Sequence, residues 1–308
     1  MSSLSEHFFT DLVFYNGQPY CKGGGDGGAL QPCSPSLSDE VDSLYEAEVR
    51  DKEGEFAISW NGVRFRAASL VDTDGNKHYF LRRIPSHVPT LKGYNKIFVD
   101  KLLQNPRQQG LLLAIGPQGA GKTTFASAVC AARLTKHGGH AVCIEDPPEY
   151  ALQGKHGEGL CFQRACPRAG FAEALVAAYR YSSPDVLFLG EIRDEHVALE
   201  VLKAASNGQF VISTIHGRDV PSGLQRLEAL ASGATSKTDT VRELMSHGLY
   251  AAVSQTLSFK SGEGRISNLK FLFLDEKNYG VRKTIASGEF SKLESAMQAQ
   301  QNELLNVL

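Results

Sequence analysis

Apolar and polar residues alternate in one part of this chain and cluster in another. Alternation over residues 43–84 predicts four half-buried strands, at Tyr45–Arg50, Glu55–Trp60, Val63–Leu70 and Lys77–Ile84. Hairpin-turn signals stand between them at Asn61-Gly62 and Asp74-Gly75. Residues 41–90 are therefore expected to form a small antiparallel sheet domain.

After Gly110 the pattern changes to short apolar runs separated by helical stretches. These runs are Leu111–Ile115, Ala141–Ile144, Val186–Leu189 and Phe210–Thr214. Their order predicts an α/β domain over residues 110–308, in which a mostly parallel sheet is covered by helices on both faces. Ligands of such domains collect at the carboxyl ends of the strands.

The remaining segments carry weaker signals. Residues 1–40 contain the run Gly23–Gly28, which Pro32 and Pro35 follow, and this pattern indicates a flexible, irregular segment. Pro85 and Pro89 end the sheet domain, and Asn95–Leu103 has the spacing of a linker helix within residues 91–109. A final amphipathic helix is expected over Ser291–Leu308.

Composition narrows the classes of partner and compartment. A formal net charge of -2 gives no sign of a basic surface for nucleic acid or an anionic membrane. The six cysteines form no CxxC pair, so we interpret them as reduced core thiols of a cytosolic protein. The start of the chain has no secretory pattern, and the apolar runs are too short to span a bilayer. We expect a cytoplasmic protein that is attached to a membrane only peripherally.

The segment from Gly116 to Thr124 reads GPQGAGKTT, between an apolar strand and the predicted helix Phe125–Leu134. This is the GxxxxGK[ST] pattern of a phosphate loop, in which glycines let backbone N–H groups turn toward an anion. Lys122 places a positive charge between the outer phosphates, and Thr123 offers a hydroxyl to Mg²⁺. We therefore expect ATP and Mg²⁺ here, with nucleotide-binding residues Gly116, Gln118, Gly119, Ala120, Gly121, Lys122, Thr123 and Thr124.

Three more motifs follow strand ends, and each leaves two interpretations open. The carboxylates of Glu145, Asp146 and Glu149 suit a Mg²⁺–water network, with Glu145 and Asp146 as metal ligands beside Thr123, or they only solvate a turn. Glu191 could polarise an attacking water, or begin a helix and stabilise its dipole. His216 could sense the terminal phosphate or relay between subunits, or it could be structural.

The four motifs in this order resemble the PilT-like family of secretion and pilus motor ATPases. The matching segments are the phosphate loop, the acidic box IEDPPEY, the second nucleotide motif GEIRD and the histidine box STIHG, within a resemblance that covers roughly residues 43–300. The resemblance implies a PAS-like sheet domain followed by a RecA-like P-loop ATPase domain. It also implies catalytic roles for the acidic, histidine and arginine residues at the matching positions: Glu191, His216, Glu149, Arg64, Arg66 and Arg82.

Charged residues on the solvent face of a strand would explain the three arginines equally well. The chain also departs from the family pattern. Gln209 stands where retraction motors have a second histidine, and Gly217-Arg218 follows the histidine box in place of a small or hydroxyl residue. No CxxC insertion separates His216 from Gln255, which argues against the pilus-assembly and type II secretion branch.

The resemblance implies a homo-oligomeric, hexameric motor that hydrolyses ATP. It would act at the cytoplasmic face of an inner-membrane complex, either a type IV pilus that it retracts or a type IV secretion or conjugation apparatus. Two alternatives from other classes are a nucleic-acid translocase on a related fold and a ring component that binds ATP without turnover. The charge balance speaks against the first, so no nucleic acid is expected as partner, and intact Lys122, Thr123 and Glu191 speak against the second.

Overall fold

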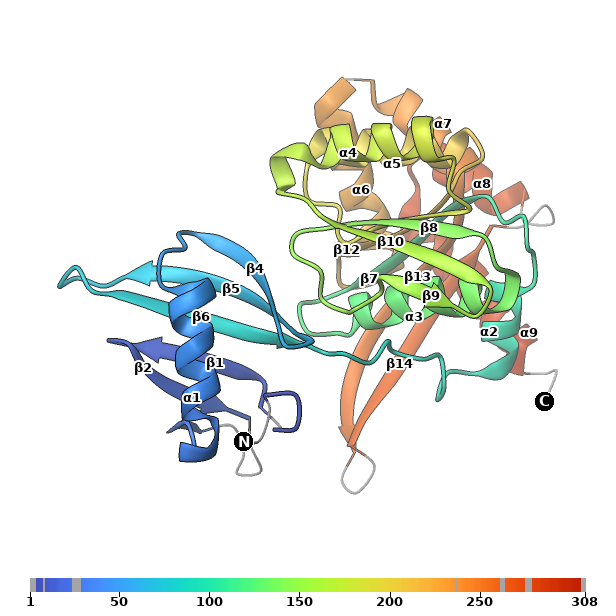
Figure 1. Cartoon of the computed structure of the whole chain (residues 1–308). Helices are drawn as coiled ribbons and strands as arrows, with labels where there is room; N and C mark the ends of the chain where they lie inside the picture. The colour runs from blue at the N-terminus through green and yellow to red at the C-terminus, as the bar shows by residue number, and fades with distance from the viewer. Residues whose placement is uncertain are drawn as a thin grey trace. The chain divides into compact units, whose positions relative to one another are not determined.

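The computed structural model describes residues 4–7, 9–23, 29–235, 237–260, 264–274 and 279–305. The chain divides into two units, Met1–His87 with Pro147–Ala151, and Val88–Asp146 with Leu152–Leu308 (Figure 1). Each unit is described below by itself.

The first unit contains a six-stranded antiparallel sheet in the order β3-β2-β1-β6-β5-β4. Two-residue turns with positive φ connect its hairpins, Asn16-Gly17 between β1 and β2 and Asn61-Gly62 between β4 and β5. A helix packs its apolar side chains Leu37, Val41 and Leu44 into the core of this unit. The elements are β1 Asp11–Tyr15, β2 Gln18–Lys22, β3 Leu30–Pro32, α1 Pro35–Leu44, β4 Glu55–Trp60, β5 Val63–Val71 and β6 Lys77–Ile84.

Three of the four expected strands of this unit are confirmed, and two expectations are wrong. Tyr45–Val49 continues α1 as a π-helical turn, because Tyr45 and Val49 follow the buried face of the helix. Much of residues 1–40 is not irregular, since β1, β2 and β3 form one side of the sheet. The alternation of β1 covers only Asp11–Tyr15, too short a signal to stand out beside the glycine run. Residues 24–28 of that run lie outside the described residues.

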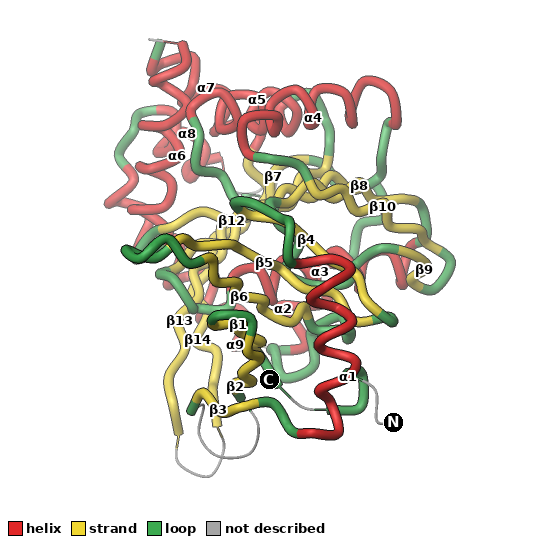
Figure 2. Tube along the Cα trace, turned by 60° about the vertical axis from the view of Figure 1, so that its left-hand side comes forward, coloured by secondary structure: helices red, strands yellow, loops and turns green. Residues whose placement is uncertain are grey.

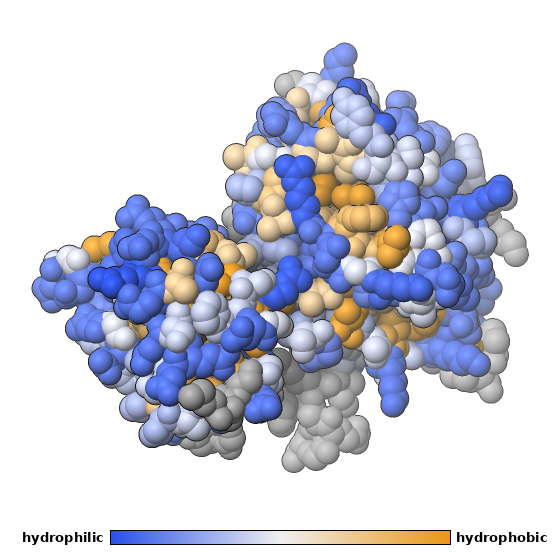
Figure 3. Space-filling model, viewed as in Figure 1, coloured by the Kyte–Doolittle hydropathy of each residue, from blue (hydrophilic) through white to orange (hydrophobic). Residues whose placement is uncertain are grey.

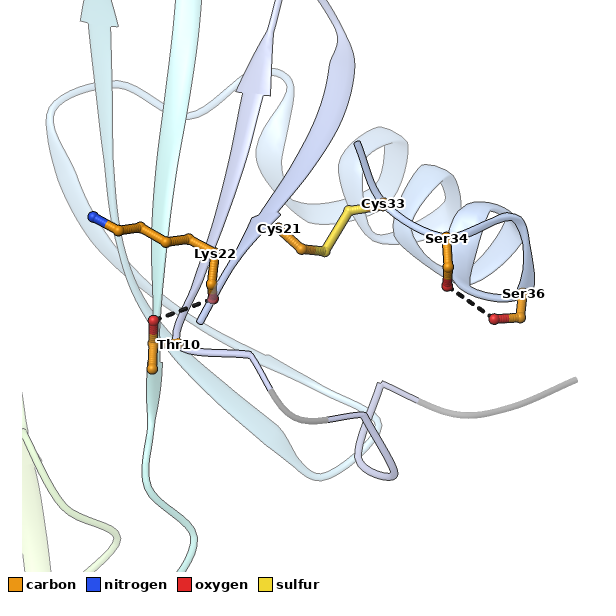
Figure 4. The surroundings of a disulfide bond; sticks show 6 residues. All are labelled: Thr10, Cys21, Lys22, Cys33, Ser34 and Ser36. Carbon is orange, nitrogen blue, oxygen red and sulfur yellow. Dashed lines mark hydrogen bonds between the residues drawn. A yellow bond between two sulfur atoms is a disulfide. The ribbon is translucent and has the colours of Figure 1, made fainter. Parts of the chain in front are cut away.

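The interpretation of all six cysteines as free thiols is also wrong. Cys21 and Cys33 form a disulfide that joins β2 to the residues before α1 (Figure 4). Their Cα atoms are 5.3 Å apart, within the usual range for a disulfide. Pairing of β2 with β3 brings the two cysteines together, which a sequence separation of 12 does not reveal. The other four cysteines are free and buried, as expected: Cys130, Cys143, Cys161 and Cys166.

The second unit is built on an eight-stranded sheet in the order β14-β13-β7-β12-β11-β8-β10-β9. Its six central strands are parallel, and β9 and β14 are antiparallel additions at the two edges. The four expected buried strands occur as β7, β8, β11 and β12. The strands are β7 Gly110–Gly116, β8 His140–Glu145, β9 Gly154–His156, β10 Gly159–Ala165, β11 Val186–Leu189, β12 Phe210–His216, β13 Leu249–Lys260 and β14 Gly264–Phe273.

Helices cover both faces of this sheet (Figures 1 and 2). Two lie on one face, α2 Lys96–Leu103 and α3 Lys122–His137, and four on the other, α4 Phe171–Ala177, α5 Glu195–Ser206, α6 Val220–Thr235 and α7 Thr238–Gly248. A helix is therefore confirmed at the expected place as α2, within the second unit, and Asn95 caps it by accepting a hydrogen bond from Phe98 N. The chain continues through α8 Tyr279–Ala286 to α9 Leu293–Leu305, which lies along β14, and residues 306–308 of the expected last helix lie outside the described residues.

The predicted fold class is confirmed, with an antiparallel sheet in the first unit and a mostly parallel sheet in the second. Because β7, β8, β11 and β12 run in parallel, their carboxyl ends meet at one edge of the sheet. All four predicted motifs begin at that edge. Among the described residues, every helix is too short or too polar to cross a membrane.

Candidate active site

The phosphate loop connects β7 to α3, and glycine is required in it for two different reasons. Gly119 and Gly121 have φ of +75° and +84°, in the left-handed region that side chains disfavour. At Gly116 the constraint is space, because a Cβ would lie 2.5 Å from the backbone oxygen of Gln255 on β13. The start of the loop therefore packs directly against β13. The positive φ angles of Gly119 and Gly121 then turn its backbone into the first turn of α3.

Lys122 is the first residue of α3 and is only 7% exposed. Its Nζ donates a hydrogen bond of 2.9 Å to the carbonyl oxygen of Pro117, so the side chain bends back across the loop. Thr123 and Thr124 follow half-buried in the first helical turn. Backbone N–H groups at the start of a helix together with a lysine ammonium form a site for a polyanion.

Glu145 ends β8 and is 2% exposed. Its Oε1 accepts a hydrogen bond of 2.7 Å from Gln163 Nε2 on the adjacent β10. Gly190 leaves room for it on the other side, because a Cβ there would lie 3.2 Å from Glu145 Cγ. A carboxylate is thereby buried and oriented at the edge where the phosphate loop begins, and a larger residue than glycine at position 190 would crowd it.

Glu191 follows β11 between two basic groups. Its Oε1 lies 3.1 Å from His216 Nε2, and its Oε2 contacts the guanidinium of Arg193. The approach to His216 lacks hydrogen-bond alignment, and Glu191 Oε1 is buried with no hydrogen-bond donor among the described residues. The carboxylate is therefore held between His216 and Arg193, and its Oε1 can accept a hydrogen bond from a water molecule.

His216 ends β12 directly beside the phosphate loop, since it pairs with Gly116 in the parallel register of β12 and β7. Burial lowers the pKa of His216 below its ordinary value, and the nearby charge of Lys122 lowers it further. Glu191 opposes this shift, while Arg193 and Arg226 add to it. The imidazole is therefore neutral at pH 7 and can both donate and accept a hydrogen bond.

Two buried hydroxyls fix the strand ends that carry Glu191 and His216. Thr214 Oγ1 donates to the carbonyl oxygen of Gly190, and Ser213 Oγ donates to that of Leu189, both at 2.8 Å. These bonds extend the β11–β12 pairing to the last residue before Glu191. The positions of Glu191 and His216 are thus set by backbone geometry on rigid strands.

The residues present suit a nucleotide with a hydrated Mg²⁺. Among the described residues no group of three histidine, cysteine or acidic side chains could by itself enclose a metal ion. Mg²⁺ commonly keeps several waters and uses one or two protein oxygens together with phosphate oxygens. The hydroxyl of Thr123 and the carboxylates of Glu145 and half-buried Asp146 are oxygens of that kind at this edge.

The other predicted catalytic residues belong to the first unit. Glu149 is exposed within Pro147–Ala151. Arg64 and Arg66 alternate with the buried residues of β5 and so face away from the core. Arg66 pairs with Arg82 of β6, and Arg82 Nε donates to Asp11 Oδ1 at 2.8 Å. The structure therefore brings Lys122, Glu145, Glu191 and His216 together within one unit, and it leaves the roles of the arginines and Glu149 as predictions.

Sequence reasoning missed three residues of this site: Arg193, Gln163 and Gln255. Arg193 stands within the quoted GEIRD motif, where its spacing of two from Glu191 was the available signal. Gln163 and Gln255 lie on strands whose pairing partners are distant in the chain, so only the topology places them beside Glu145 and Gly116.

Comparison with known proteins agrees with this geometry. The sequence profile of the family described as type II/IV secretion system protein matches residues 55–276. The chain is 32% identical over 252 residues to the type IV pilus retractation ATPase PilT of Pseudomonas aeruginosa, covering 80% of this chain and 70% of that protein. It is 32% identical over 272 residues to a twitching motility protein of Neisseria gonorrhoeae, covering 86% and 68%.

Among solved structures, the chain resembles the pilus retraction motor PilT with bound ADP. The TM-score is 0.75 at 28% identity, over 94% of this chain and 86% of that one. The fold, the order of the motifs and the matched profile agree, and the resemblance noted in the sequence is confirmed. The chain therefore belongs to the family of type II/IV secretion system proteins.

Proposed function

We propose that this protein is a motor ATPase that works on a type IV pilus or a type IV secretion apparatus. The observation that carries the proposal is the placement of Glu191 beside His216, whose strand pairs with the start of the phosphate loop. A base positioned across from a bound triphosphate is what hydrolysis requires. The named activity of the PilT relatives supports the same assignment.

In this proposal each residue has a defined task. Lys122 neutralises charge on the outer phosphates, and the N–H groups of the first turn of α3 hold them. Thr123, Glu145 and Asp146 hold Mg²⁺, directly or through water; when bound, the ion supplies positive charge to the phosphates. Glu191 orients a water molecule and accepts its proton at Oε1 as the oxygen attacks the terminal phosphorus. Neutral His216 donates a hydrogen bond toward the terminal phosphate and thereby reports whether it is present.

A second part of the proposal concerns which membrane complex the motor acts on. The two pilus-related relatives support work on a type IV pilus, and the family description leaves secretion as the second candidate. We also propose that Arg64, Arg66, Arg82 and Glu149 assist the reaction in the assembled protein. Their support is the resemblance together with the solvent-facing position of the arginines on β5 and β6.

We further propose a homo-oligomer, by resemblance a hexameric ring at the cytoplasmic side of the inner membrane. An apolar surface on the second unit supports self-association, because single soluble chains seldom expose such patches. Figure 3 shows hydrophobic residues gathered over β8 and β10, where Leu160 and Phe162 are 47% and 51% exposed. Phe162 also lines a hollow of about 630 Å³ with Tyr181, which is 87% exposed.

The test is ATP turnover by the full chain, measured as phosphate release with and without Mg²⁺, together with the mass of the assembly in solution. Turnover that requires Mg²⁺ and is lost in Lys122→Ala is the expected result. Turnover unchanged in Lys122→Ala would show that the phosphate loop is not the site. Stimulation of ATP turnover by DNA would favour a nucleic-acid translocase. A monomer with full activity would contradict the proposed ring.

A further inference from the structure

Three of the buried free cysteines of the second unit meet at one place, and the proposed hydrolysis uses none of them. Cys143 on β8 and Cys161 on β10 lie on neighbouring strands, and their Sγ atoms are 3.3 Å apart. The thiol of Cys130, on α3, contacts both. Each of the three is at most 1% exposed. The fourth, Cys166, directs its Sγ to the carbonyl oxygen of Pro167 instead.

The pair Cys143 and Cys161 lies beside the pair that orients Glu145. Cys143 precedes Glu145 by two residues on β8, and Cys161 precedes Gln163 by two residues on β10. Side chains two residues apart on a strand share a face of the sheet. Both pairs therefore cross from β8 to β10 on one face, with the same sequence separation of 18. A change in the distance between the two sulfurs is for this reason transmitted to the bond between Gln163 and Glu145.

Cys161 is the thiol of this group that is best suited to react. Hydrogen bonds with Cys130 and Cys143 lower its pKa, which favours the thiolate, the nucleophilic form of cysteine. Its strand also lies next to the edge of the sheet, where β9 pairs with it over three residues, Gly154–His156. Pairing over so few residues at an edge opens more readily than the central sheet, and such opening admits a small oxidant.

We propose that Cys143 and Cys161 are a redox-sensitive pair, which a hydroperoxide converts to a disulfide that displaces Gln163 from Glu145. The Cys161 thiolate attacks one oxygen of hydrogen peroxide, so an S–O bond forms, the O–O bond breaks, and the departing hydroxide takes up a proton. The Cys143 sulfur then attacks the Cys161 sulfur, so an S–S bond forms and the S–O bond breaks. The proton of the Cys143 thiol leaves with that hydroxide as water. The two sulfurs together lose two electrons, which the peroxide gains.

Formation of this bond requires the two strands to shift. A disulfide is about 2.05 Å long, so the sulfurs must approach each other by more than about 1 Å. The hydrogen bond of 2.7 Å from Gln163 to Glu145 does not keep its alignment through a shift of that size. Glu145 then loses the donor that orients it, and the protein should bind Mg²⁺ more weakly. This last step rests on the proposed function, in which Glu145 holds the ion.

The test uses the full chain, with hydrogen peroxide as the oxidant. Mass spectrometry of an unreduced digest should find Cys143 linked to Cys161 after treatment. The Mg²⁺ concentration for half-maximal ATP turnover should rise by about tenfold, the usual effect of losing a partner of a metal ligand, and dithiothreitol should restore it. Cys161→Ser should show neither change. The matched control is Cys166→Ser, the same replacement at a buried cysteine outside the group, and it should show both.

Gln163→Leu tests the connection to Glu145. This variant lacks the donor to Glu145, so its Mg²⁺ requirement should be raised before treatment, and peroxide should raise it little further. A full further rise on oxidation would overturn Gln163 as the connection between the disulfide and the metal ligand.

The remaining outcomes separate this inference from the proposed function. A treated protein without the link, or with a link through Cys130, would overturn the pair. A link that leaves the Mg²⁺ requirement unchanged would overturn its effect on Glu145, even if the maximal rate falls. Absence of ATP turnover in the untreated protein would overturn the proposed function. The digest would still decide whether the pair forms, because its detection does not depend on ATP.

Discussion

Glu191 Oε1 lies 3.1 Å from His216 Nε2, at the ends of two strands that pair with each other. The histidine is nearly neutral in this position because burial and the charge of Lys122 lower its pKa more than Glu191 raises it. Oε1 of the carboxylate therefore faces a polar but uncharged ring, while Oε2 contacts the guanidinium of Arg193, and Oε1 is the oxygen placed to accept a proton from a water molecule.

Activity should persist below the ordinary histidine pKa. His216 has a lowered pKa in the folded protein, so it stays neutral as the pH falls through 6.5 and becomes charged only at lower pH. We expect the acid limb of kcat to begin below pH 6.5, and His216→Gln to remove that limb with a lower maximal rate. A pH profile of kcat at saturating ATP checks this, and an acid limb above pH 6.5 would contradict the assigned environment.

The same shift has a consequence for stability. Between 6.5 and the lowered folded pKa, the unfolded chain takes up a proton at His216 before the folded chain does. The stability that the folded chain gains from a neutral His216 is therefore fully present above pH 6.5, and it is lost as the pH falls through this window. Urea unfolding at several pH values should show a smaller loss in His216→Gln than in the unmodified chain, and equal losses would argue against the shift.

Two glycines of the phosphate loop should differ in their sensitivity to alanine. Gly116→Ala places a Cβ 2.5 Å from a backbone oxygen, so the strand pairing must shift, and we expect a loss of about 2–3 kcal/mol. Gly119→Ala meets no atom within 4 Å and suffers only from its φ of +75°, a cost of about 1–2 kcal/mol. Chemical unfolding of both variants measures the order, and a more stable Gly116→Ala than Gly119→Ala would contradict the packing of the loop on β13.

Gln163 should matter for stability although it lies outside the sequence motifs of the site. Gln163→Leu keeps the volume but removes a donor to the buried carboxylate of Glu145, which should cost about 1–3 kcal/mol. Gln153→Leu serves as a control on the neighbouring segment, because Gln153 Oε1 accepts from the backbone N–H of Gln163 and so tests the loss of an amide that does not contact Glu145 in the described part of the chain. Equal stability of Gln163→Leu and the unmodified chain in urea would mean that Glu145 does not depend on this bond.

The disulfide between Cys21 and Cys33 predicts how many cysteines of the unreduced protein react with a thiol reagent. Alkylation of the denatured, unreduced protein should label four cysteines, and reduction should add Cys21 and Cys33. A loop closed over a sequence separation of 12 should stabilise the first unit by about 2–3 kcal/mol relative to Cys21→Ser/Cys33→Ser. Mass spectrometry reads the label, and six labelled thiols before reduction would show that the pair is open.

Local patterns predicted the parts of the fold that depend on neighbouring residues. Strong alternation and the turn signals Asn61-Gly62 and Asp74-Gly75 identified β4, β5 and β6, and the apolar run before Gly116 identified β7. The β13–β14 hairpin was not predicted, because its strands join the sheet through pairing with β7, which is distant in the chain. The residues of the site divide in the same way into local and long-range signals. Lys122, Glu191 and His216 stand in sequence motifs, whereas Gln163 and Gln255 are recognisable only after the strands are paired.

The rate of hydrolysis by Glu191→Gln tests the central claim most directly. Glutamine keeps the shape of the side chain but cannot accept the proton, so the rate in a single turnover should fall by about 100-fold or more while ATP stays bound. Glu173→Gln, an exposed carboxylate on α4, should hydrolyse ATP like the unmodified chain. Hydrolysis by Glu191→Gln at the unmodified rate would contradict the assignment of Glu191 as the base.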